Sequence, residues 1–71
     1  MTNEQKILNI LASRIWGEST RNISNYVGFR MPATRSILYR LEQKGDVKSK
    51  LIGNQRVWFY NRNIDKMSKD I

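Results

Sequence analysis

The sequence contains no cysteine and no histidine. Without cysteine, neither a disulfide framework nor a thiolate metal site can form. Without histidine, the most common general base and the imidazole metal ligand are also missing. The acidic residues are few and scattered, and each glycine stands alone at the boundary of an expected element, so no phosphate-binding loop is present. We therefore predict that the chain is not an enzyme and that it uses no cofactor and no metal.

Long apolar segments are also missing. No apolar run approaches the ~18 residues that a membrane-spanning helix needs, and the first residues are typical of a capped helix rather than of a signal peptide. We therefore expect a cytoplasmic protein with no membrane partner. The 71 residues, of which 39% are hydrophobic, allow one small domain with a modest core. We place that domain at residues 1–62 and a short tail at residues 63–71.

Acidic residues are scarcest in the middle of the chain. Nine of the thirteen Lys and Arg residues lie between Ser19 and Ile64, where only Glu42 and Asp46 oppose them. This segment therefore carries the whole net charge of +7, because the charges of the two ends cancel. Each phosphate that a cation neutralises releases condensed counterions, so concentrated positive charge favours a nucleic-acid partner.

Hydrophobic spacing predicts two helices in the first part of the chain. Thr2 and Gln5 fit a capping box, and the apolar residues behind them indicate a helix that ends near Ile15. We expect Trp16 to fold back as a lid on the core. Ser19 or Thr20 then caps a second helix, which ends before Gly28.

A third helix and a hairpin follow. Pro32 suits the first turn of a helix that Gly45 ends, with an inward stripe formed by Thr34, Ile37, Leu38 and Leu41. Residues 47–52 and 56–60 alternate between apolar and polar types around a Gly53-Asn54-Gln55 turn, which indicates a β-hairpin. The alternation puts Trp58 and Tyr60 on one face, but it does not decide which face is buried. The predicted fold is mainly α with a small β-hairpin (α+β), a winged helix-turn-helix with three helices followed by a two-stranded wing.

In that fold the third helix enters the major groove of DNA. Polar and cationic residues on its outer face are therefore the candidates for reading bases: Arg35, Ser36, Tyr39 and Arg40. For the arginines, phosphate contact or simple solvation is an alternative, and for Tyr39 the alternative is packing of its ring against the hairpin. Further cations are candidates for phosphate contacts: Arg21, Arg30, Lys48, Lys50 and Arg56. The strand cations could instead discourage edge-to-edge pairing.

Two other functions remain open at this stage. The aromatic residues could stack on single-stranded bases, although a domain this small needs them for its core. The fold could also serve as a protein-protein interaction module that docks another regulator without binding DNA itself. A duplex-binding, sequence-specific transcription regulator is the interpretation that the charge pattern favours.

Two segments resemble a known family. The run TRNISNYVGF (residues 20–29) and the run RSILYRLEQKGDV (residues 35–47) are similar to the small fimbrial-operon transcription regulators of the PapI and FaeA type, as is the VWFY end of the hairpin. The resemblance implies control of a pilus operon and phase variation. It implies double-stranded promoter DNA containing GATC and a second protein, the leucine-responsive regulatory protein, as partners.

The resemblance also bears on single residues. Arg35 matches an arginine of the family's recognition helix, which supports its choice as a base reader. Met31 and Pro32 depart from the polar residues that the family has there, so a different operator preference is open. No dimerisation helix is apparent in the sequence, and we expect a monomer or weak dimer that is associated with the nucleoid.

Overall fold

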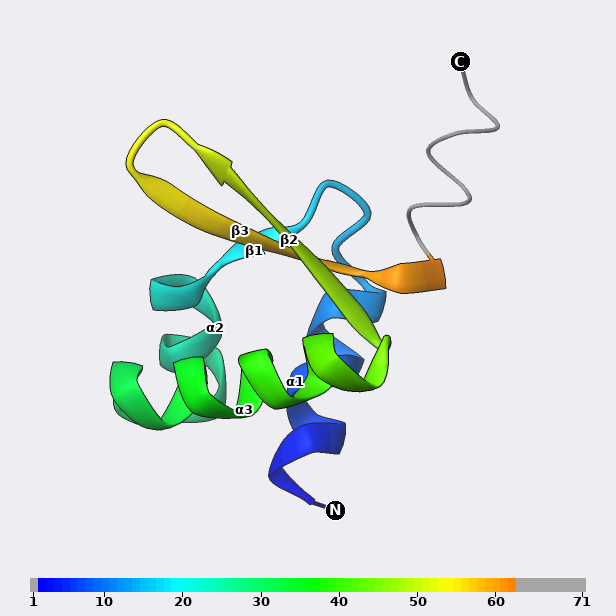
Figure 1. The fold of residues 1–71 in the computed structure, drawn as a ribbon. Helices are drawn as coiled ribbons and strands as arrows, with labels where there is room; N and C mark the ends of the chain where they lie inside the picture. Colours follow the sequence, from blue (N-terminus) through cyan, green and yellow to red (C-terminus); the bar gives the residue numbers. More distant parts are fainter. Residues whose placement is uncertain (1, 63–71) are drawn as a thin grey trace.

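The structure, a computed structural model, describes residues 2–62. It contains three helices and three strands in the order α1 (Asn3–Ala12), β1 (Glu18–Ser19), α2 (Thr20–Val27), α3 (Met31–Lys44), β2 (Val47–Ile52) and β3 (Gln55–Tyr60). The three helices pack together, and a sheet with the strand order β1-β3-β2 lies against them (Figure 1). The predicted three helices and hairpin are confirmed. The predicted tail at residues 63–71 lies outside the described residues.

The start of α1 follows the prediction, but its end does not. The Thr2 hydroxyl accepts a hydrogen bond from the backbone N–H of Gln5 at 3.1 Å, as an N-cap does. The helix ends at Ala12 rather than near Ile15. Ser13 is its C-cap, with the hydroxyl donating to the carbonyl of Ile10, and the chain then turns towards β1. The turn brings the next residues beside β3.

The expected role of Trp16 is wrong. Its side chain is 78% exposed, so it does not cover the core. Trp58, which is fully buried, fills that place instead. The core is formed by seven apolar residues that α1, α2, α3 and the sheet contribute: Ile7, Leu11, Ile23, Leu38, Leu41, Val47 and Trp58.

Strand β1 is an element that the sequence did not reveal. Its two residues pair antiparallel with β3, Glu18 opposite Trp58 and Ser19 opposite Val57. Two residues are too few to show the alternation that marks a strand. The pairing makes β3 the central strand of the sheet and ties the start of α2 to the wing.

The hairpin register decides which face of β3 is buried. Ser49 pairs with Trp58 and Leu51 pairs with Arg56, and directly paired residues share one face of an antiparallel sheet. The turn is Gly53-Asn54 alone, because β3 begins at Gln55. Trp58 and Tyr60 therefore face the helices, whereas Lys48, Lys50 and the residues opposite them lie on the outer face.

Gly17 is required where α1 turns into β1. Its φ of +82° is a conformation that side-chain-bearing residues rarely adopt, and a Cβ there would lie 2.8 Å from the carbonyl oxygen of Trp58. We predict that Gly17→Ala lowers the free energy of unfolding by about 2 kcal/mol or more, since strain and overlap add. The melting temperature should fall by roughly 8 °C or more.

Gly28→Ala is the matched control. Gly28 also has a positive φ, of +77°, but a Cβ there would meet nothing within 4 Å. It should therefore cost only the conformational strain, about 1 kcal/mol. If the two variants had equal melting temperatures, a Cβ at position 17 would not overlap Trp58 as the structure indicates.

Candidate nucleic-acid interface

The helix-turn-helix is built by α2, the segment 28–30 and α3. The Ser19 hydroxyl caps α2 by accepting from the N–H of Asn22 at 3.2 Å, and Gly28 ends the helix in the left-handed conformation. Phe29 is half-buried in the turn, and α3 begins at Met31 with a proline in its first turn. The first turn of α3 therefore follows the end of α2 after three residues.

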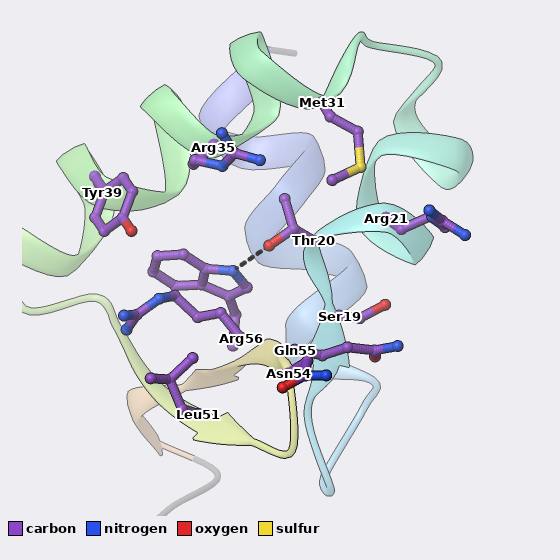
Figure 2. A pocket seen from close by; sticks show the side chains of 11 residues that line it. Ser19, Thr20, Arg21, Met31, Arg35, Tyr39, Leu51, Asn54, Gln55 and Arg56 are labelled. Atoms are coloured by element: carbon purple, nitrogen blue, oxygen red, sulfur yellow. Dashed lines mark hydrogen bonds between the residues drawn. The ribbon is translucent and has the colours of Figure 1, made fainter.

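A hollow of about 350 Å³ lies between the start of α2, the N-terminal half of α3 and the wing. Figure 2 shows Met31 and Arg35 on the α3 side and Leu51 on the opposite, wing side. The residues that line it come from all three elements and from β1: Ser19, Thr20, Arg21, Met31, Arg35, Tyr39, Leu51, Asn54, Gln55, Arg56 and Trp58.

The hollow is cationic. Arg21, Arg35 and Arg56 line it, and none of the lining residues is Asp or Glu. Three positive charges in a hollow with no carboxylate among its lining residues attract an anion. The arginines of α2, α3 and the wing therefore converge on one side of the molecule.

Arg35 is the arginine most available for a ligand. It is exposed, and no ion pair or hydrogen bond holds its guanidinium within residues 2–62. All five of its N–H donors can therefore turn to a partner, and a guanidinium can grip a guanine edge or a phosphate with two hydrogen bonds.

Arg56 is held in place by neighbours. Its Nη1 donates to the Ser49 hydroxyl at 2.8 Å, and that hydroxyl in turn donates to Oε2 of Glu42 at 2.6 Å. Its guanidinium also lies 5.9 Å from the ring centre of Tyr39 and 6.0 Å from that of Trp58. These contacts hold the guanidinium between α3 and the wing, at the wall of the hollow.

Tyr39 packs against the wing, which was the alternative weighed from the sequence. Its ring meets that of Trp58 edge to face, with 5.3 Å between centres and an angle of 83°. The residue is still 41% exposed and lines the hollow. It therefore belongs to the wall of the hollow as well as to the contact between α3 and the sheet.

The other two proposed base readers do not line the hollow. Ser36 is exposed next to Arg35. The guanidinium of Arg40 lies 3.5 Å from the carboxylate of Glu4 on α1, and Lys44 lies 3.0 Å from the same carboxylate. The hydrogen bond from Lys44, followed by the contact with Arg40, holds the pKa of Glu4 below its usual value. Glu4 thus draws the C-terminal half of α3 towards α1.

The remaining cations proposed for phosphate contact lie around the hollow rather than in it. Arg30 is exposed at the N-cap of α3. Lys48 and Lys50 are exposed on the outer face of the sheet, opposite Phe59 and Val57. The wing therefore carries cations on both faces. Lys48 and Lys50 lie on the outer face, and Arg56 lies on the face that lines the hollow.

Several lining residues were not singled out as site residues from the sequence. Ser19 and Thr20 were read as caps, Asn54 and Gln55 as turn residues, and Leu51 as an ordinary strand position. Ser19 and Thr20 lie beside the wing because β1 pairs with β3.

Trp58 forms the floor of the site. Its indole N–H donates to the hydroxyl of Thr20 at 2.8 Å, and both residues are buried (Figure 2). This bond joins the middle of β3 to the first residue of α2. The distance between the wing and the helix-turn-helix depends on it.

Within the described residues, no group of Asp or Glu side chains could hold a metal ion. The helices between residues 2 and 62 are all too short and too polar to cross a membrane.

No protein-family model and no curated protein sequence matches the chain. Among solved structures it is similar to MepR, a transcription regulator of the Staphylococcus aureus multidrug efflux pump MepA, with a TM-score of 0.74, 18% identity and 99% of this chain covered. It is also similar to NadR, solved in complex with 4-hydroxyphenylacetate, with a TM-score of 0.73, 19% identity and 99% coverage.

The chain has the winged helix-turn-helix fold. It spans only 57% of the MepR chain and 55% of the NadR chain. The likeness at this level of identity establishes the fold, and the predicted fold class is confirmed.

The Trp58–Thr20 bond can be tested directly. We predict that Thr20→Val lowers the free energy of unfolding by about 1–3 kcal/mol, because the buried indole N–H loses its acceptor. Thr20→Ser, which keeps the hydroxyl, should cost less than about 1 kcal/mol. Urea unfolding followed by circular dichroism measures both values. If Thr20→Val and Thr20→Ser lower the free energy of unfolding equally, the Thr20 hydroxyl does not act as the acceptor for the indole N–H.

Proposed function

We propose that the protein is a sequence-specific, double-stranded DNA-binding transcription regulator without enzymatic activity. The observation that carries the proposal is the acid-free hollow lined by Arg21, Arg35 and Arg56 at the exposed first turns of a helix-turn-helix. DNA is the polyanion that suits this geometry, because α3 can enter the major groove while the wing reaches the next groove. Similarity in fold to a transcription regulator, rather than to an enzyme, supports it.

Within this proposal Arg35 is the principal base reader. It stands in the N-terminal half of α3, is exposed, and has no competing carboxylate among the described residues. Ser36 and Tyr39 can add hydrogen bonds from the same helix. Arg40 can join them by leaving its exposed contact with Glu4, because exposed ion pairs contribute little.

Phosphate contacts supply affinity that does not depend on sequence. We assign them to cations at both edges of the hollow and on the wing: Arg21, Arg30, Lys48, Lys50 and Arg56. The backbone N–H groups at the starts of α2 and α3 add to these contacts, since the N-terminus of a helix attracts anions.

The finer proposal comes from the sequence resemblance. The similarity of residues 20–29 and 35–47 to fimbrial-operon regulators supports control of a pilus operon and phase variation at promoter DNA containing GATC. A single winged-helix module buries only about 600–1,000 Å² on DNA. A co-bound protein, the leucine-responsive regulatory protein in this proposal, would supply the further specificity, with the chain itself a monomer or weak dimer.

The first test concerns base reading. In a titration of a duplex selected from a randomised pool, Arg35→Ala should weaken binding by about 1–3 kcal/mol, and it should weaken binding to unselected duplex much less. The reason is that a lost base contact affects only the sequence that offers it. Equal losses on both duplexes would remove Arg35 from the base readers.

Two cations serve as controls for this test. Lys50→Ala should weaken both duplexes alike, because a phosphate contact carries no sequence information. Lys44→Ala removes the same charge from the far end of α3, where Lys44 contacts Glu4, and should change neither affinity appreciably. Absence of binding to any duplex, together with capture of a regulator that resists nuclease, would favour the protein-docking alternative over DNA binding.

The second test concerns salt. If about six phosphates are neutralised, the logarithm of the binding constant should fall against the logarithm of salt concentration with a slope of roughly −5. Fluorescence anisotropy across a range of potassium chloride concentrations measures the slope. A slope near zero would contradict the cationic interface.

A further inference from the structure

The tip of the wing is apolar and exposed. Leu51 and Ile52, the last two residues of β2, are 63% and 53% exposed, and neither belongs to the core or packs against it. Adjacent exposed apolar residues on a hairpin invite unwanted association unless a partner covers them. They are the last residues of β2 before the hairpin turn, at the end of the wing that projects away from the helices (Figure 1).

The register places the two side chains on both sides of the tip. Leu51 pairs with Arg56 and lines the hollow, whereas Ile52 pairs with Gln55 and is not among the lining residues. The surroundings are cationic. Lys48, Lys50 and Arg56 lie on the same two strands, and no Asp or Glu occurs between residues 47 and 60. The tip is thus an apolar end on a positively charged arm.

We propose that Leu51 and Ile52 form an apolar wedge that enters the minor groove of the duplex bound by α3. This inference rests on the proposed function. Phosphates border the minor groove, so its edges complement the cations of the wing, while deoxyribose C–H groups form its walls and suit apolar side chains. Apolar residues that enter this groove can also part base steps and bend the duplex.

The hollow sets where the wedge enters. With α3 in the major groove, the sugar-phosphate strand that separates the two grooves passes between Arg35 and Leu51, on the opposite sides of the hollow. The adjacent minor groove lies about half a helical turn, or ~5 base pairs, from the centre of the α3 contacts. A guanine there projects its 2-amino group into the groove, whereas an A·T pair does not. The wedge therefore favours A·T pairs at that place.

The first arm of the experiment changes the protein. The double variant Leu51→Ser with Ile52→Ser should bind the selected duplex roughly tenfold more weakly than the unaltered chain, equivalent to about 1.4 kcal/mol. The salt slope should stay the same, because no charge is removed. Ile15→Ser, which alters an exposed isoleucine in the α1–β1 turn, should leave the affinity unchanged. Leu51 and Ile52 are both exposed, so the melting temperatures of the double variant and of the unaltered chain should match.

The second arm changes the DNA. Replacing A·T pairs by G·C at the wedge position should weaken binding by the unaltered protein, and replacing them by inosine·C should restore it. Inosine lacks the 2-amino group but keeps the major-groove edge of guanine. The double serine variant should no longer distinguish G·C from inosine·C. This loss of discrimination is a readout that a merely structural role of the tip would not produce.

The outcomes separate the wedge from the proposed function. If the unaltered protein binds the selected duplex and the double variant binds equally well, the wedge is wrong and the DNA-binding function stands. Retained discrimination between G·C and inosine·C in the double variant would overturn the wedge in the same way. If the unaltered protein binds no duplex, the proposed function fails, and the wedge fails with it.

Discussion

The arrangement of the whole site depends on one buried contact, the hydrogen bond from the indole of Trp58 to the hydroxyl of Thr20. Trp58 sits in the central strand, and its ring also meets the edge of Tyr39 on α3. One side chain therefore joins the sheet to both helices of the helix-turn-helix. Because an unpaired indole N–H is costly in an apolar core, the hydrogen bond holds the wing against the start of α2, and the Tyr39 ring contact holds it against α3. The hollow lies between these elements.

The charges are sorted around that space. Glu4 accepts contacts from Arg40 and Lys44 at one end of α3, and Glu18 lies 3.5 Å from Arg14. Glu42 reaches Arg56 only through the Ser49 hydroxyl, which positions the arginine without covering it. None of these acids lines the hollow, and none forms an ion pair with Arg35. The arginines that line the hollow direct the positive field of the protein to that surface, and such a field guides a polyanion to it.

A small fold limits how such a surface can recognise a partner. The core holds seven fully buried apolar side chains. Trp58 is one of them, so it cannot act as a stacking platform. Recognition is left to α3, to the arginines at the edges of the hollow and to the tip of the wing. Arg21 lies in the first turn of α2, Arg35 in the N-terminal half of α3 and Leu51 at the hairpin end, where side chains can contact a ligand without disturbing the core.

Local patterns determined much of this protein. Capping residues, glycine stops and hydrophobic spacing were enough to predict three helices, a hairpin and the candidate arginines, because each depends on residues a few positions apart. The end of α1, the strand β1 and the exposure of Trp16 depended on pairing between residues about forty positions apart, such as Glu18 with Trp58. The hairpin register put Trp58 and its partners on one face of the sheet, and the packing of that face against the helices placed Leu51 across the hollow from Arg35. Sequence spacing determines which face of an element a residue occupies, whereas only packing decides what that face meets.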